Sequence, residues 1–97
     1  MSLDAFVMQV NQNCESVDVS RDGERVRIKF VFLNDLLARQ FIDGAERTDL
    51  SRVSPVLRNV EVNVIDDRTV EVVFEFRSKV FASAYYTMLE EALKEGD

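Results

Sequence analysis

Apolar and polar residues alternate along two stretches of the chain, residues 16–32 and 59–76. Alternation at every second residue is typical of a β-strand that buries one face. Each stretch is broken once by turn-forming residues, Asp22-Gly23 in the first and Asp66-Asp67 in the second. Because glycine accepts the positive φ that a tight turn needs, the pattern predicts two antiparallel hairpins and thus four strands.

A helix is predicted at the start of the chain, because apolar residues recur there at spacings of three and four, as on one side of a helix. Its stripe consists of Leu3, Phe6, Val7, Val10 and Cys14. Ser2 is suited to cap this helix. An edge strand over residues 5–10 remains an alternative for so short a segment.

Each predicted hairpin is followed by a predicted helix, with Asn34 and Ser78 as corresponding N-caps. The apolar side of the second helix carries Leu37, Ala38, Phe41, Ile42 and Ala45, and Gly44 marks its end. The third carries Phe81, Ala82, Tyr85, Met88, Leu89 and Ala92 and runs to about Glu95. Residues 46–55 link the two halves; Leu50 and Val53 fit a single helical turn.

The two halves resemble each other in sequence. The stretch "VRIKFVFLNDLLARQF", residues 26–41, is echoed by "VEVVFEFRSKVFASAY", residues 70–85, with the same residue at corresponding positions in four places. An internal duplication explains this echo, and so does the periodicity that any hairpin followed by a helix must show. The sequence leaves both explanations open.

The sheet order follows from charge. If the phenylalanines of the second and fourth strands point inward, their opposite faces show Arg25, Arg27 and Lys29 on one strand and Glu71 and Glu75 on the other. Opposite charges on neighbouring strands are favourable, so these two strands should lie side by side. We therefore predict a single α+β domain over residues 1–97, with helices on one face of an antiparallel sheet of order 1-2-4-3.

Composition narrows the classes of function. The formal net charge is −6 and the pI is near 4.6, which works against general attraction to nucleic acids and anionic membranes. Cys14 is the only cysteine, so no intramolecular disulfide forms and a reducing cytoplasm is the expected location. The first residues do not read as a signal peptide, and no apolar run is long enough to span a membrane.

Catalytic chemistry is not indicated. The chain has no histidine, the commonest general base and zinc ligand. Cys14 is predicted to be a structural thiol, since reactivity needs a lowered pKa and access. The acidic pairs Asp66-Asp67 and Glu90-Glu91 consist of adjacent residues, whose side chains point apart. We expect neither an enzyme nor a bound cofactor or metal ion.

A protein interface is the leading functional prediction. Apolar residues outside the predicted core are Val31, Leu33, Ile65 and Val73 on the outer sheet face, joined by Tyr86 on the third helix. Clustered apolar residues on a small surface often mark subunit contacts. The sequence therefore predicts a non-enzymatic interaction or assembly module, an adaptor or chaperone-like protein that forms a homodimer and binds a further protein.

Nucleic-acid contact is the alternative, through a basic strand that carries Arg21, Arg25, Arg27 and Lys29. It is disfavoured because bases stack on exposed aromatic residues, and here the phenylalanines point inward. The element order over residues 26–95 resembles the small dimerising subunit of the tRNA-modifying KEOPS complex, which would imply an accessory subunit. Residues 54–76 are similar to the final strands of phage baseplate-wedge proteins. Neither resemblance assigns a role to any residue.

Overall fold

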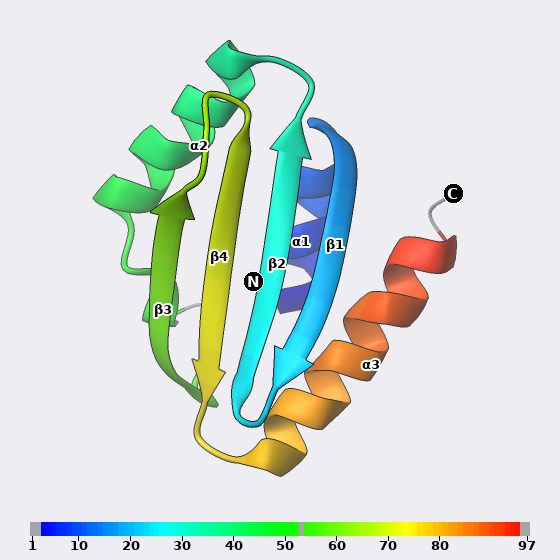
Figure 1. Cartoon of the computed structure of the whole chain (residues 1–97). Coiled ribbons are helices and arrows are strands. Elements are labelled where there is room, and N and C mark those ends of the chain that lie inside the picture. Colours follow the sequence, from blue (N-terminus) through cyan, green and yellow to red (C-terminus); the bar gives the residue numbers. More distant parts are fainter. Residues whose placement is uncertain (1–2, 53, 96–97) are drawn as a thin grey trace.

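The computed structural model describes residues 3–52 and 54–95, which form three helices, a short 3₁₀ turn and one four-stranded sheet. The elements are α1 (Leu3–Asn11), β1 (Cys14–Asp22), β2 (Arg25–Phe32), α2 (Asp35–Arg47), η1 (Leu50–Arg52), β3 (Leu57–Val64), β4 (Thr69–Phe76) and α3 (Lys79–Glu95). All strand pairs are antiparallel and the order is β1-β2-β4-β3 (Figure 1). The predicted fold class and strand order are confirmed.

The core lies between the sheet and a layer of three helices. The inward rings of Phe30, Phe32, Phe74 and Phe76 are almost completely buried. In Figure 1, α2 lies behind the β3 side of the sheet, α3 runs along the β1 side, and α1 lies behind the sheet between them. The buried side chains of strands and helices form one contiguous cluster.

The N-terminal segment is a helix, and the alternative of an edge strand is wrong. The Phe6 ring lies 6.2 Å from the Phe41 ring of α2 and 6.3 Å, edge-on, from the Phe74 ring of β4. Leu3 and Val7, one turn apart, are fully buried. Because α1 supplies the central part of the helix layer, it completes the core of this chain. The Ser2 cap lies outside the described residues.

The charges that predicted the sheet order are paired in the structure. Arg25 faces Glu75 across β2 and β4, and Lys29 faces Glu71. Arg25 Nε lies 3.2 Å from a Glu75 carboxylate oxygen, and Arg27 reaches Glu71 at 3.6 Å. Such pairs contribute little energy each, yet they favour this pairing over the alternatives.

The two hairpin turns use different devices. Gly23 holds the first position of the β1–β2 turn with φ +63°, the sign that a two-residue hairpin turn of type II′ requires there. In the β3–β4 turn, the Asp66 carboxylate accepts a hydrogen bond from the Arg68 backbone N–H at 2.9 Å. This bond and others to Thr69 lower the pKa of Asp66. Asp66 therefore stabilises a turn, as the sequence suggested.

Both predicted N-caps of the later helices are present. Asn34 accepts a hydrogen bond from the Leu37 N–H at 2.9 Å, and Ser78 accepts one from the Phe81 N–H at 3.2 Å. The predicted end of the second helix at Gly44 is wrong, because α2 continues to Arg47. Residues 45–47 include Ala45, which packs partly buried, and two good helix formers, which together offset the cost of a glycine in the helix. Val53 lies outside the described residues.

Cys14 was placed on the first helix, and this placement is wrong. The helix ends at Asn11, the Asn13 N–H donates to the Val10 carbonyl, and Cys14 begins β1. Its half-buried thiol donates a hydrogen bond to the same carbonyl at 3.3 Å. Burial raises the pKa of the Cys14 thiol to about 11. The thiol is therefore protonated at neutral pH.

Candidate interaction surface

The residues predicted to form an interface do not form one patch. Val73 does lie on the outer sheet face, but it is only 2% exposed. Its neighbours across the sheet are Arg27 on β2 and Glu61 on β3, and their long side chains account for this burial on a face that no helix covers. Val73 is therefore unavailable to a partner, contrary to the prediction.

Three of the predicted residues lie around one end of the sheet. Val31 pairs with Thr69, and the Ile65 N–H donates to the Thr69 carbonyl at 2.9 Å. Leu33 follows β2 directly. Leu33 and Ile65 are exposed, whereas Val31 is half-buried.

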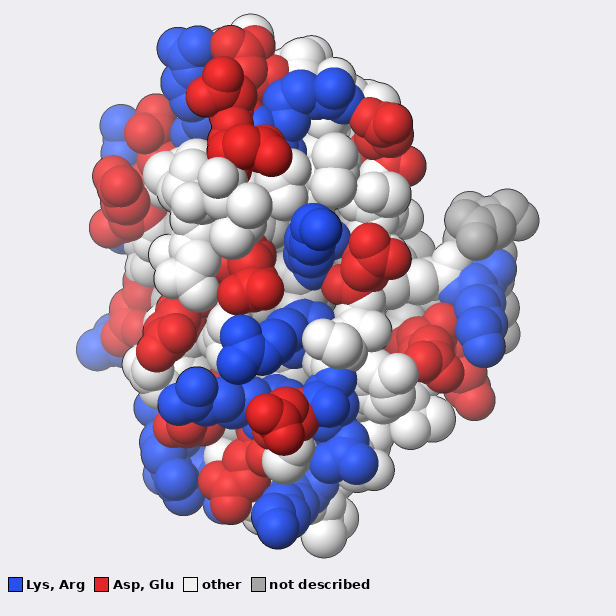
Figure 2. Space-filling model, in the orientation of Figure 1, with Lys and Arg blue, Asp and Glu red and all other residues white. Residues whose placement is uncertain are grey.

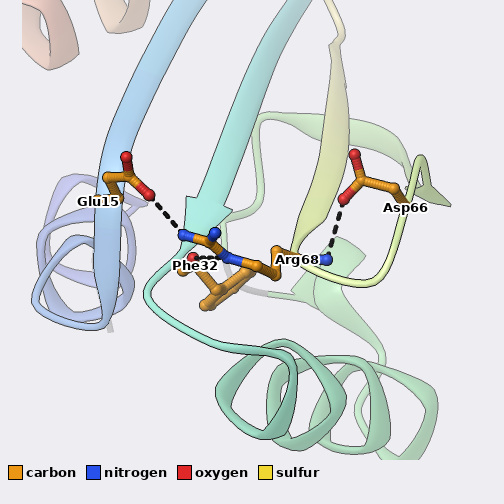
Figure 3. A network of polar contacts seen from close by, with 4 residues as sticks. All are labelled: Glu15, Phe32, Asp66 and Arg68. Atoms are coloured by element: carbon orange, nitrogen blue, oxygen red, sulfur yellow. Dashed lines mark hydrogen bonds and ion pairs between the residues drawn. The ribbon is translucent and has the colours of Figure 1, made fainter.

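A charged side chain crosses that same end of the sheet. Figure 3 shows Arg68 extending from the β3–β4 turn over the end of β2 to β1. Its Nε–H donates to the Phe32 carbonyl at 3.1 Å, and its guanidinium forms an ion pair with the Glu15 carboxylate. The exposed apolar residues here therefore stand beside a charged network that joins β1, β2 and the β3–β4 turn, which makes this end a poor apolar docking surface.

The four basic residues of the alternative hypothesis are not brought together. Arg25, Arg27 and Lys29 lie on the outer face of β2. Arg21 pairs with Val26, an inward residue, so it lies on the opposite face, where it donates to the Gly23 carbonyl at 3.0 Å. The prediction of a single basic face over all four residues is wrong.

The remaining basic stripe is one strand wide and is bordered by acidic residues on both sides. On β1, Asp22 and Asp18 stand opposite Arg25 and Lys29, and β4 contributes Glu71 and Glu75. Figure 2 accordingly shows positive and negative groups side by side over this face. The ring-bearing residues of the described strands point into the core. This face therefore offers neither a continuous positive surface nor a stacking platform.

The buried side of α3 differs from the prediction. Ala82 and Leu89 are fully buried, as expected, but Phe81 and Met88 are 42% and 36% exposed. Tyr86, predicted at an interface, instead packs half-buried against the core. Its hydroxyl donates to a Glu90 carboxylate oxygen at 2.6 Å, and this bond raises the pKa of Tyr86.

The opposite side of α3 is apolar and exposed. Side chains turn by about 100° per residue, so residues three and four positions from Ala84 lie within about 60° of it. We call this surface the α3 outer face; it consists of Val80, Phe81, Ala84, Thr87 and Met88. Val80 is 76% exposed. No charged residue stands between Lys79 and Glu90 in the sequence, so at least two turns of this helix present a neutral surface to solvent.

Helix α2, which corresponds to α3 in the other half, exposes Leu36 at the position of Val80 but has no charge-free face of comparable length. Its solvent side is charged in every turn, by Asp35, Arg39, Asp43, Glu46 and Arg47. Arg39 and Asp35 form an ion pair at 2.8 Å. The two helices therefore share their buried sides but differ in what they expose. The sequence signal that could have revealed the α3 outer face is the absence of charged residues between Lys79 and Glu90, in a helix that follows the capping residue Ser78.

Basic and acidic groups border the α3 outer face at opposite ends. Arg21 and Lys79 line an open groove together with Val80, Ser83, Ala84 and Thr87. Arg77 precedes the helix, and its Nε–H donates to the Pro55 carbonyl at 3.1 Å. Glu90 and Glu91 occupy the other end, where Figure 2 shows charged groups near the C-terminal residues. The neutral face thus has a positive rim at its start and a mainly negative rim at its end.

Comparisons with known proteins give no relative for this architecture: neither a family model, nor a curated protein, nor a solved structure matches the chain. Among the described residues, no helix has the length and apolar character needed to cross a bilayer. The class that the fold and the surface define is a two-layer α+β protein with one neutral, exposed helix face.

Proposed function

We propose that this chain is a non-enzymatic protein interaction module, an adaptor or chaperone-like protein that acts in the cytoplasm as a homodimer. One observation carries the proposal: the α3 outer face is exposed and free of charge, although the chain is rich in charged residues. A surface of this kind is costly to leave in water, because its large side chains, Val80, Phe81 and Met88, are apolar and exposed. Its burial against a partner is the favourable outcome.

Self-association is favoured over other partners because a twofold contact uses the same patch twice. Each large apolar residue that one copy contributes is met by the same set from the second copy. Val80, Phe81 and Met88 then supply six apolar side chains to one contact, twice the three of a single copy. Because this surface carries no charge, its burial against a second copy removes no charged group from water.

The open edge of β1 is a less suitable route to a dimer. The outer face of β1 carries Asp18 and Asp22 between serines. Pairing two copies of β1 in antiparallel fashion about Asp18 or Ser20 places aspartates opposite each other. Like charges on facing strands are destabilising, and charged edge strands commonly prevent edge-to-edge association.

The test is a mass measurement on three proteins by size-exclusion chromatography with light scattering. The chain has a mass of 11.2 kDa, so a dimer has twice that mass, 22.4 kDa. Ala84→Arg places a charge at the centre of the α3 outer face without touching the core, and we expect it to give a monomer. Gln40→Arg introduces the same residue at the corresponding exposed position of α2, 44 residues earlier, and should leave the dimer intact.

Circular dichroism of both variants controls for folding. A monomeric wild-type protein at high concentration contradicts self-association. A dimer that survives Ala84→Arg contradicts the choice of surface.

A further inference from the structure

We infer that two copies of this chain pair through antiparallel α3 helices, with Ala84 on the twofold axis. The inference deepens the proposed function and rests on it. It goes further by fixing the direction of the helices and the residue at the centre. The charges and side-chain sizes along α3 carry it.

The positions along the helix are self-complementary in the antiparallel direction. In a pair centred on Ala84, each residue faces the one at the same distance on the other side of residue 84 in the second copy. Val80 then faces Met88 of the second copy, and Phe81 faces Thr87. Apolar residues thereby meet apolar or neutral ones along the whole α3 outer face.

The ends of the same pairing bring opposite charges together. Lys79 is the first residue of α3, and Glu90 and Glu91 lie near its other end, so in an antiparallel pair the positive end of each helix lies beside the negative end of the other. Arg21 adds positive charge beside the face, where it lines the same groove as Lys79. A parallel pair would instead place like charges together at each end, which is unfavourable.

The centre of the face permits close approach. Ala84 has a small side chain, and its neighbour Ser83 is also small, so two helix axes can reach the 8–10 Å that is typical of packed helices. Val80, Phe81 and Met88 project on both sides of Ala84 and can fill the space between the helices. In Figure 1, α3 runs along the β1 edge of the sheet, and Val80, Phe81 and Met88 on its outer face are 36–76% exposed.

Cysteine crosslinking tests the direction of the pair, in a Cys14→Ser background that removes the native thiol. Ala84→Cys should form a covalent dimer under mild oxidation, since it faces itself across the axis. Val80→Cys and Met88→Cys should each form few crosslinks alone, because each faces the other position, and a residue lies about 12 Å along the axis from its own copy. An equimolar mixture of the two variants should crosslink to about half the extent of Ala84→Cys, because only the dimers that combine one copy of each variant bring the two cysteines together.

Charge exchange gives a second, independent measurement. Lys79→Glu and Glu91→Lys should each weaken the dimer, with dissociation constants raised at least threefold. The double variant restores opposite charges in both pairs and should recover most of that loss. If the charges acted only within each copy, the effects of the two substitutions would add.

The outcomes separate this inference from the proposed function. Crosslinks of Val80→Cys and Met88→Cys each with itself, in a protein that keeps its dimer mass, overturn the antiparallel pair and leave the homodimer standing. A dimer mass with no crosslink at any of the three positions overturns the use of α3 as the contact. A monomer mass for the parent protein removes both proposals.

Discussion

Replacing Gly44 by alanine should stabilise this protein, which is unusual for a change within a helix. Gly44 lies in the interior of α2, where glycine is less favourable than alanine by about 0.8–1.0 kcal/mol. A Cβ atom built at this position meets no atom within 4 Å, so alanine causes no overpacking. The full helix propensity difference should therefore appear as added stability.

The expected gain is about 1 kcal/mol in the free energy of unfolding. For a domain of 97 residues this corresponds to a rise in Tm of about 4–8 °C. Urea and thermal unfolding followed by circular dichroism measure it. Wild type and variant must be compared at one protein concentration, because the proposed dimer would make the apparent stability depend on concentration.

Gly23→Ala is the matched control. A Cβ atom at Gly23 also meets nothing within 4 Å, so the two glycines differ in backbone conformation and not in available space. Gly23 has φ +63°, a region that costs an L-residue about 1–2 kcal/mol. We expect Gly23→Ala to lower the stability by that amount.

A neutral or destabilising Gly44→Ala would refute the reasoning. Gly44 borders an apolar cleft of about 320 Å³ that Phe6, Phe41 and Leu50 also line. A loss of stability would show that the open space at this cleft is needed by the fold.

Two further predictions concern single side chains. Cys14 should react with an aromatic disulfide reagent at pH 8 about tenfold more slowly in the folded protein than in urea. The rise in its pKa from 9.0 to about 11 lowers the fraction of thiolate about 100-fold, and the greater nucleophilicity of the more basic thiolate recovers about tenfold of this. Because the pKa of Cys14 is higher in the folded than in the unfolded state, the thiol contributes stability that is fully present below pH 9 and is lost as the pH rises towards 11. The urea midpoint should therefore fall over that range, and less so in Cys14→Ser. Arg68→Met keeps the stem but removes the bonds to the Phe32 carbonyl and Glu15, and should cost about 1–2 kcal/mol in urea unfolding; an unchanged midpoint would show that the network in Figure 3 adds nothing.

The sheet could be predicted from the sequence because three independent signals agreed. Period-two alternation located the strands, Asp22-Gly23 located one turn, and opposite charges on the second and fourth strands selected their pairing. The register then placed Arg25 opposite Glu75. Where local preference and long-range pairing point to the same answer, a single sequence suffices.

The surface could not be predicted in the same way, because exposure depends on neighbours that periodicity does not contain. The alternation of the strand predicts that Val73 points outward, and it does. It is nevertheless buried, because Arg27 and Glu61 stand beside it on the neighbouring strands. The prediction of which side of α3 is buried was wrong for a related reason. Both sides of that helix are apolar, so the spacing of Phe81 and Met88 fits a core stripe as well as an exposed one.

The difference between α2 and α3 is the strongest argument that the exposed face of α3 has a role. The two helices follow equivalent central strands, begin at equivalent caps and bury equivalent small residues, Ala38 and Ala82. Their solvent sides differ in charge: the positions of α2 that correspond to residues 80–89 include Arg39 and Asp43, whereas α3 carries no charge there. Since the fold tolerates charges on the solvent side of α2, the fold alone does not require their absence from α3, and this is why we propose that a partner covers this face.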